Sequence, residues 1–280
     1  MIDWLRDAGG IRQAERDALE MMVDQSADNR TEVDRATMPI LAGSCGICGR
    51  QAGFRINGTD SNCLREGLQC LDCRCNARQR AAAMVLLESL PDPMRAKVHA
   101  TEQASHLYVA LRRWLPHLRG SEFQPRWLQR LRFSLWLARH GVFEPVRRED
   151  VTRLGFDGAS LDAVLSLDVL EHVPDHRLAL REFARVLKPG GALVLTVPFY
   201  DDRDASSIIA SCNEDGSVSH VGEPEYHGDP ISGGVLCFHH FGWDLLDAMH
   251  MAGFREARAV RVFAPRQGLP QGQWVMHATR

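Results

Sequence analysis

The sequence predicts an α/β protein, in which a doubly wound and mostly parallel sheet follows a small cysteine-rich segment. Two stretches carry this prediction. Residues 161–198 read as strand, helix and strand, and residues 45–73 hold two Cys-x-x-Cys pairs. A chain of 280 residues is long enough for one large or two modest domains with a full core.

The stretch from 161 to 198 is the centre of the predicted sheet. Its first run, Leu161 to Leu167, is apolar with few breaks, as expected of a parallel strand that is covered on both faces. Asp175 can cap the helix that follows, whose apolar residues recur at helical spacing: Leu180, Phe183, Ala184 and Leu187. Pro189-Gly190-Gly191 ends this helix, and Ala192 to Val197 is a second apolar run. Strand, helix and strand in this order form a right-handed βαβ unit.

The composition excludes several classes of protein. Hydrophobic residues make up 45% and charged residues 25%, as in ordinary globular proteins. The net charge of −3 gives no general attraction to nucleic acid or to an anionic membrane. No apolar run approaches the roughly 20 residues of a membrane span, and the start MIDWLRDAGG does not look like a secretory signal. We therefore expect a cytoplasmic protein with no membrane partner.

Three segments follow one another along the chain. Residues 1–40 hold a helix over Ile11 to Val23 and a polar linker. Residues 41–93 hold the cysteines and a helix, and residues 94–280 hold the α/β domain. Neither part of the first segment suggests chemistry.

Six of the eight cysteines fall between residues 45 and 75. Cys45 and Cys48 form one Cys-x-x-Cys pair, and Cys70 and Cys73 form a second pair 21 residues further on. In a compartment without disulfides, two such pairs predict a tetrahedral zinc site. Cys75 can replace Cys73, so the fourth ligand stays open between them. Redox chemistry at one pair, or cysteines without a ligand, are the alternative interpretations.

The second pair leads into a basic helix, which runs from Asn76 to Leu90 and ends at Pro91. Arg74, Arg78 and Arg80 would suit a nucleic-acid-binding surface. No aromatic stacking platform accompanies these arginines, so we favour a structural staple that packs onto the α/β domain.

The motifs of the central stretch carry a resemblance to a known family. Ser166-Leu167-Asp168, then Val169 to Asp175, then Arg185 to Gly191 resemble the class I S-adenosylmethionine (SAM)-dependent methyltransferases. The similarity extends from Met94 to the C-terminus. It implies a Rossmann-like sheet of seven strands with an antiparallel last strand, and SAM as cofactor. The cysteine segment is similar to a small zinc ribbon that precedes some methyltransferase domains, which implies structural zinc.

The resemblance assigns cofactor-binding roles to the ends of three expected strands. The first strand, 96–101, is followed by Glu102, Gln103, Ala104 and Ser105, where the family has a glycine-rich turn. Here the acid is kept and the glycines are absent. The second strand, 118–123, places Glu122 where the family binds the ribose hydroxyls. After a third strand over 145–149, Asp150 and Val151 match the residues that bind adenine.

Residues 124–140 predict an amphipathic helix between these strands. Its apolar side holds Trp127, Leu128, Leu131, Leu135 and Trp136, with arginines around it. We favour a packing helix with a solvated arginine face. A basic lid, or a contact surface for an anionic acceptor, is the alternative.

The acceptor half begins past the fourth strand, at the edge where open α/β sheets bind ligands. Asp168 can face the methionine part of SAM or the acceptor, and His172 is either a packing residue or a polar group of the site. Some forty residues then separate Pro198 from the next helix, and they include a hairpin formed by 206–212 and 217–221. His227 and His239 are our candidate general bases in this connection. A metal site of His227, Asp229 and His239 is an alternative.

A helix over 243–251 and two strands, 258–263 and 274–279, complete the chain. The sequence thus favours a zinc-containing, SAM-dependent methyltransferase that acts on a small-molecule or sugar-containing acceptor. The alternative is a non-catalytic zinc-containing scaffold, or a nucleic-acid-binding protein, that kept the fold. The missing glycines support this alternative, whereas the three acids Glu102, Glu122 and Asp150 argue against it.

Overall fold

The computed structural model describes residues 14–15, 17–18, 21, 40–51, 53–56, 64–123, 126–213, 215–227 and 234–280. Residues 14, 15, 17, 18 and 21 are helical, in the stretch where the sequence predicts the first helix. The predicted polar linker, together with Cys63 and Asp229, lies outside the described residues.

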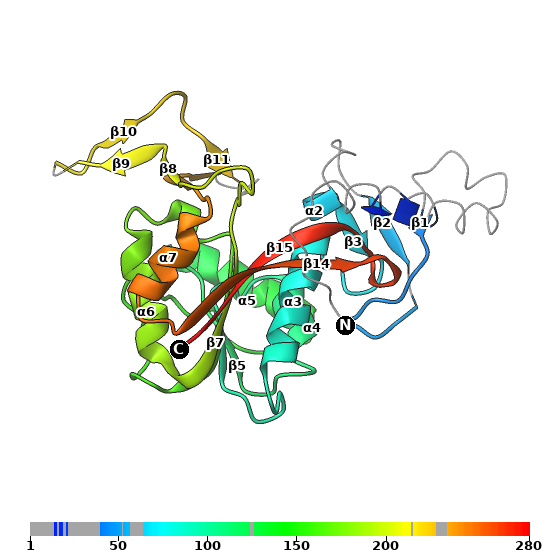
Figure 1. The fold of residues 1–280 in the computed structure, drawn as a ribbon. Coiled ribbons are helices and arrows are strands. Elements are labelled where there is room, and N and C mark those ends of the chain that lie inside the picture. The colour runs from blue at the N-terminus through cyan, green and yellow to red at the C-terminus, as the bar shows by residue number, and fades with distance from the viewer. Residues whose placement is uncertain are drawn as a thin grey trace.

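A six-stranded sheet forms the centre of the molecule (Figure 1). Its order is β14 (Glu256–Ala264), β15 (Leu269–Thr279), β7 (Leu187–Thr196), β6 (Leu161–Leu167), β4 (Val98–Ala100) and β5 (Leu118–Gly120). The strands from β7 to β5 are parallel, whereas β15 is antiparallel to both of its neighbours. The parallel sheet with an antiparallel last strand is therefore confirmed.

The sheet differs from the prediction in two places. β7 begins at Leu187, so Pro189-Gly190-Gly191 belongs to this strand instead of ending the helix. The predicted third strand, over residues 145–149, is absent. In its place a single parallel bridge joins Glu122 to Arg148, next to the end of β5. Pro145 has no backbone N–H to donate. The described residues thus give a sheet of six strands rather than seven.

Helices cover both faces of this sheet (Figure 1). One face packs against α3 (Ala77–Ser89), α4 (His106–Leu111) and part of α5 (Trp127–Arg139). The other face packs against α6 (His176–Val186) and α7 (Asp244–Met251). Asp175 caps α6 as expected, because its Oδ1 accepts the backbone N–H of Leu178 at 3.0 Å.

The cysteine segment is a small antiparallel sheet of β1 (Ile40–Leu41), β2 (Phe54–Ile56) and β3 (Leu68–Cys70), with a short helix α2 (Leu64–Gly67). We call residues 40–76 the ribbon. Its buried side chains belong to the same hydrophobic core as the face of the large sheet that α3 covers. The long β14–β15 hairpin reaches the ribbon, where the N–H of Ser44 donates to the carbonyl of Arg266 at 3.0 Å (Figure 1).

The apolar side of α5 does not pack as the sequence predicted. Four of its large apolar side chains are exposed: Trp127, Leu128, Leu131 and Leu135. Leu137 is the buried residue of this helix, and Trp136 is partly buried. The expectation of a packing helix is therefore wrong for most of its apolar side.

The described residues of the connection after β7 form six short strands. They are β8 (Ser207–Ile208), β9 (Ala210–Cys212), β10 (Val218–His220), β11 (Tyr226–His227), β12 (Val235–Leu236) and β13 (His239–His240). The predicted hairpin is present as β9 and β10. β13 contacts the 3₁₀ helix η2 (Leu170–His172), so the connection returns to the carboxyl end of β6. In the part of the chain that the structure describes, no helix is both long and apolar enough to cross a bilayer.

Candidate functional site

The carboxyl ends of β4, β5 and β6 bring three acids to one edge of the sheet. Glu102 follows β4, Glu122 follows β5 and Asp168 follows β6 directly. These strands are adjacent and parallel, so their carboxyl ends lie side by side. Glu102 and Glu122, two of the three acids named from the sequence, therefore lie at one edge of the sheet together with Asp168.

The turn after β4 is held by Glu122. One oxygen of this carboxylate, Oε1, accepts the backbone N–H groups of Gln103 at 2.8 Å and Ala104 at 2.7 Å. None of residues 101–105 has a positive φ, so side chains are compatible with this turn. Burial raises the pKa of Glu122 to about 7, and the charge of Glu102 adds to this rise. The backbone of this turn therefore does not require glycine, and the carboxylate of Glu122 holds it in place.

Gln103 lies inside the protein rather than in the site. Its side chain is fully buried, with Nε2 donating to the carbonyl of Pro145 at 3.2 Å and Oε1 accepting the N–H of Arg147 at 2.9 Å. A side chain at Gly120 would collide with it, since an added Cβ would lie 2.6 Å from its Cγ. Gln103 therefore fastens the turn to the segment that replaces the third strand. A direct contact of its side chain with a cofactor does not fit this position.

Ser105, Asp150 and Val151 take more ordinary positions. The Ser105 hydroxyl caps α4 by accepting the N–H of Tyr108 at 3.1 Å. The Asp150 carboxylate accepts the N–H and the hydroxyl of Thr152 at 2.9 and 2.7 Å through one oxygen, Oδ1. Val151 is buried beside the sheet. Asp150 keeps its other oxygen without a partner among the described residues.

Asp168 is paired with arginines of the ribbon and its helix. The guanidinium of Arg65 donates to both carboxylate oxygens, at 2.8 and 2.9 Å, and the hydroxyl of Thr196 donates at 2.7 Å. Nε of Arg78 lies 3.2 Å from Oδ2. Burial alone would raise the pKa of Asp168, but the charges of Arg78 and Arg65 outweigh it and hold the pKa at about 2. Asp168 is therefore ionised at neutral pH. Its backbone lies in the left-handed region, with φ of +49°.

The same arginine reaches further along the edge. Arg78 also donates to both oxygens of Glu66, while its Nη1 is buried without a hydrogen-bond partner among the described residues. The next residue of α3, Gln79, donates to Oε1 of Glu102 at 3.3 Å. Burial raises the pKa of Glu102. The ribbon and α3 thus supply polar groups to the edge, a role that the sequence did not predict for Arg65 and Arg78.

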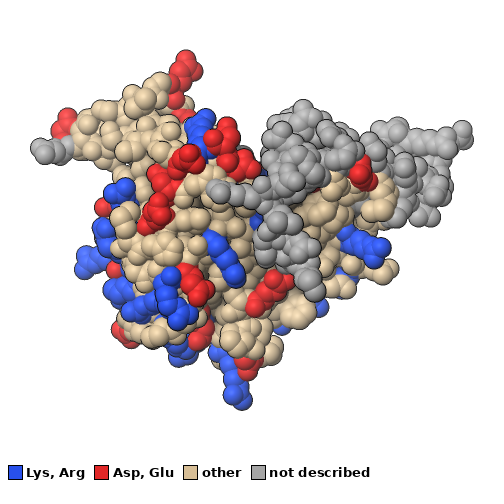
Figure 2. Space-filling model, viewed as in Figure 1, with Lys and Arg blue, Asp and Glu red and all other residues tan. Residues whose placement is uncertain are grey.

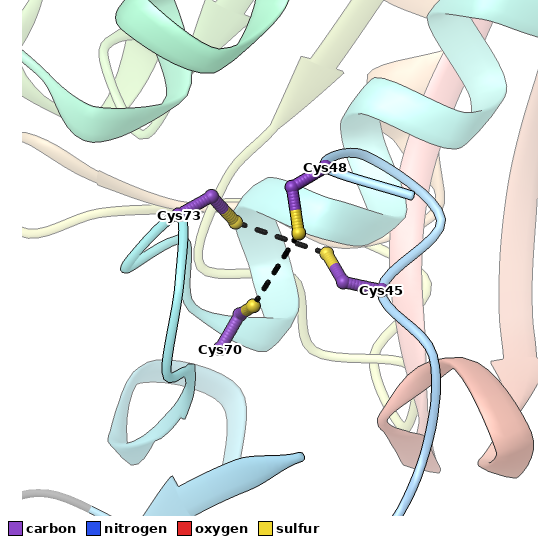
Figure 3. A group of neighbouring side chains, drawn as sticks. All are labelled: Cys45, Cys48, Cys70 and Cys73. Atoms are coloured by element: carbon purple, nitrogen blue, oxygen red, sulfur yellow. Dashed lines mark hydrogen bonds between the residues drawn. The ribbon is translucent and has the colours of Figure 1, made fainter. Parts of the chain in front are cut away.

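The four predicted zinc ligands meet in the ribbon (Figure 3). Sγ of Cys45 lies 3.7 Å from Sγ of Cys73, and Sγ of Cys48 lies 3.8 Å from Sγ of Cys70. All four sulfurs lie within 4.8 Å of one another. Zinc–sulfur bonds of about 2.3 Å in a tetrahedron place sulfurs about 3.8 Å apart, so the cluster has the dimensions of a zinc site.

The two halves of the cluster have the same backbone form. Gly49 and Arg74, which follow the second cysteine of each pair, have φ of +70° and +62°. Their N–H groups donate to the carbonyls of Cys45 and Cys70 at 2.8 and 3.0 Å. Cys75 is buried outside the group, and Sγ of Cys73 lies inside it.

The arginines after the second pair do not share one exposed surface. Arg80 is 1% exposed and donates to the carbonyls of Leu68, Cys75 and Gly268. Arg78 is paired with acids, which leaves Arg74 as the exposed member of the three. On the face in Figure 2, basic side chains alternate with acidic ones instead of forming a continuous basic stripe.

The histidines of the acceptor half separate into two places. His172 and His227 lie together with Cys237, and the ring centroids of the two histidines are 6.0 Å apart. His239 is not part of this group. Its side chain is buried beside His176, and Nε2 donates to the carbonyls of Val173 and Pro174, both at 3.1 Å. The alternative metal site of His227, Asp229 and His239 is therefore not assembled by the described residues.

Comparisons with known proteins find similarity to methyltransferases. Residues 105–195 match the family model for a methyltransferase domain. A "probable S-adenosylmethionine-dependent methyltransferase" of Mycolicibacterium smegmatis is 28% identical over 123 residues, 42% of this chain and 48% of that protein. The 27-O-demethylrifamycin SV methyltransferase of Amycolatopsis mediterranei is 46% identical over 46 residues, 16% of this chain and 17% of that protein. The chain thus spans about half or less of the length of these curated relatives.

Solved structures are similar over a larger part of the chain. A SAM-dependent methyltransferase from Mesorhizobium loti is 18% identical with a TM-score of 0.45, covering 71% of this chain and 98% of that one. Residues 105–195 of this chain therefore match a methyltransferase domain, and the chain is similar to SAM-dependent methyltransferases.

Proposed function

We propose that the protein is a SAM-dependent methyltransferase whose acceptor is a small or sugar-containing molecule. The observation that carries the proposal is the set of acids at adjacent strand ends, Glu102, Glu122 and Asp168, beside a turn with donor N–H groups. When bound, SAM supplies a methyl group on a sulfonium sulfur, which is electrophilic. The chain then has to bind the cofactor, orient the acceptor and accept a proton.

The donor set at the edge fits the parts of SAM. Glu122 offers a carboxylate for the ribose hydroxyls, and Asp150 with Val151 offers an acceptor and an apolar surface for adenine. The turn from Glu102 to Ser105 lies next to Glu122, whose carboxylate accepts its backbone N–H groups. For the methionine end, the unpartnered Nη1 of Arg78 is a buried cationic donor, which suits a carboxylate. Asp168 holds that arginine in position.

The acceptor side is proposed at the other end of the edge. His172 and His227 line it, and each keeps one ring nitrogen that has no hydrogen-bond partner among the described residues. These nitrogens are suited to act on an acceptor hydroxyl or amine. His239 is the weaker candidate, since its Nε2 is already engaged with two backbone carbonyls. The long connection after β7 would form the wall of the acceptor pocket.

Structural zinc in the ribbon is the second part of the proposal. The cysteine segment must stay reduced to bind it, which favours the cytoplasm as the compartment. Four thiolates this close together repel one another, so the cluster needs a cation to compensate their charge. In this interpretation the ribbon is a staple, and nucleic acid is not its partner.

The alternative is a protein that kept the fold without catalysis, as a zinc-containing scaffold or a nucleic-acid-binding protein. Its best support was the missing glycine turn. The hydrogen bonds from Gln103 and Ala104 to Glu122 weaken that support, because they hold a turn without glycines. The paired and buried arginines weaken the nucleic-acid version in particular.

Calorimetry with SAM and with S-adenosylhomocysteine tests the proposal. The wild-type protein should bind both, and Glu122→Gln should bind about ten- to a hundredfold more weakly, since a neutral amide accepts the ribose hydroxyls less well. The side-chain amide oxygen of Gln can still accept the two backbone N–H groups that hold the turn. Asp150→Ala should lose less, because Val151 still contacts adenine. No heat with millimolar ligand would favour the scaffold.

A further inference from the structure

A second group of metal-binding side chains lies outside the ribbon. His172 ends the 3₁₀ helix after β6, His227 ends β11, and Cys237 follows β12. One ligand atom of each lies within 4.8 Å of the others. Two imidazoles and a thiol are donors that zinc prefers. Residues up to 65 positions apart in sequence thus bring a zinc-type donor set together.

Each histidine has one ring nitrogen engaged in a hydrogen bond and a lone pair on the other nitrogen, and Sγ of Cys237 lies 3.8 Å from Nδ1 of His172. Nδ1 of His172 donates to the carbonyl of Leu236 at 2.8 Å, which leaves the lone pair on Nε2. Nε2 of His227 donates to a carboxylate oxygen of Glu225 at 2.6 Å, which leaves the lone pair on Nδ1. Metal-binding histidines almost always donate their other N–H to a carbonyl or a carboxylate. The other oxygen of Glu225 accepts from His240 at 2.7 Å, which fixes the carboxylate.

A buried carboxylate beside these ligands has no hydrogen-bond partner among the described residues. Glu171 is 0% exposed, and neither of its oxygens has a hydrogen-bond partner among the described residues. Its Oε1 lies 4.0 Å from Nε2 of His172, the nitrogen that keeps its lone pair. Buried carboxylates are normally hydrogen-bonded or bound to a metal. Glu171 is thus an independent indication that a cation belongs here.

We propose that His172, His227 and Cys237 bind a Zn²⁺ ion, with the carboxylate of Glu171 facing it. Three protein ligands are the pattern of catalytic zinc sites, in which the remaining position takes water or a substrate atom. This zinc is distinct from the one that we assign to the four ribbon cysteines.

The position of the site suggests its role. Glu171 and His172 follow Asp168 by three and four residues at the carboxyl edge of the sheet. A zinc ion there would bind an acceptor oxygen and lower the pKa of its proton. The acceptor class is then a hydroxyl, and the two histidines act as metal ligands instead of as free bases. This role rests on the proposed methyltransferase function, whereas the metal site itself does not.

Metal analysis of the full-length protein tests the site. The wild type should contain two zinc ions per chain. Cys237→Ser and His172→Ala should each contain one, and so should Cys45→Ser. Cys212→Ser is the matched control, because it removes an exposed thiol of the same connection and should keep both ions. Equal zinc in the wild type and in Cys237→Ser would overturn the proposal.

X-ray absorption at the zinc edge gives a readout that needs no variant. One four-cysteine site and one two-histidine, one-cysteine site together average about 2.5 sulfur ligands per zinc, whereas the ribbon site alone gives about four. Four sulfur ligands at one zinc per chain would exclude the second site. An intense visible band in the purified protein would indicate copper and overturn the assignment to zinc.

Binding of S-adenosylhomocysteine separates this proposal from the function. Cys237→Ser should bind it as the wild type does, since the thiol lies on the acceptor side. A protein with two zinc ions that does not bind it would refute the methyltransferase and keep the metal site. A protein that binds S-adenosylhomocysteine but contains one zinc ion would refute the second metal site and keep the methyltransferase proposal.

Discussion

Glu122 combines two functions that conflict. Its carboxylate holds the turn after β4, and in our proposal it also accepts the ribose hydroxyls of the cofactor. Burial raises its pKa from 4.5 to about 7, so the folded protein favours the neutral form. The unfolded chain ionises this group near pH 4.5. The free energy of unfolding therefore falls as the pH rises from about 4.5 to 7, and the full cost is present above pH 7.

Replacing Glu122 by Gln should therefore stabilise the protein at alkaline pH. The amide oxygen still accepts both backbone N–H groups, and no charge has to be buried. We expect the free energy of unfolding to increase by at most about 3 kcal/mol at pH 8, with little change at pH 4. Urea unfolding at the two pH values measures this. An equal effect at both would show that packing, and not ionisation, is responsible.

Arg78 should recognise the methionine end of the cofactor. Its Nη1 is the buried donor without a partner, and Arg65 continues to pair with Asp168 when Arg78 is removed. Arg78→Met should weaken S-adenosylhomocysteine about tenfold to a hundredfold, the usual effect of losing a charged hydrogen bond. Methylthioadenosine has no carboxylate and should bind as before.

Calorimetry with both ligands distinguishes recognition from structure. Equal losses for the two ligands would mean that Arg78 only holds the ribbon in place. Arg95→Met is a suitable control, because Arg95 is an exposed arginine that pairs with Asp92 away from this edge.

At the scale of elements, the strongest periodic patterns were predicted well. β6 spans Leu161–Leu167 as expected, and α6 begins after the Asp175 cap. The prediction of a third strand over residues 145–149 was wrong, because so short a run after Pro145 does not show whether it pairs with the sheet. The exposed side of α5 was wrong for a related reason: helical periodicity shows that a helix has an apolar side, but not that anything covers it.

The second pair of ribbon cysteines separates two candidate ligands that the sequence left open. Cys73 lies in the four-sulfur group, whereas the side chain of Cys75 lies 3.7 Å from the carbonyl of Cys73 and outside that group. Cys73→Ser should therefore lose the ribbon zinc, and Cys75→Ser should keep it. Zinc content after gel filtration under reducing conditions measures both. The opposite result would reassign the fourth ligand to Cys75.

At the scale of the whole molecule, distant parts of the chain form one core, and this could not be predicted from local patterns. Arg80 donates to the carbonyl of Gly268, 188 residues away, and its guanidinium lies over the ring of Phe54 at 4.6 Å. Arg65 meets Asp168 across 103 residues. Spacing and resemblance found the acids, because these follow strands. They could not find the arginines, because no motif links the ribbon to the edge.

Removal of the ribbon zinc should therefore weaken cofactor binding. The four cysteines hold β3 next to the start of α3, and the start of α3 contains Arg78. Without zinc the ribbon loses its cross-link, so Arg65 and Arg78 are no longer held beside Asp168 and Glu102. We expect Cys45→Ser to bind S-adenosylhomocysteine at least about tenfold more weakly, the loss of one charged hydrogen bond or more. Methylthioadenosine should lose less. Cys237→Ser, which should lose only the acceptor-side metal, is the matched control. Unchanged affinity in Cys45→Ser, with the ribbon zinc shown to be absent, would mean that the ribbon and the cofactor site are independent.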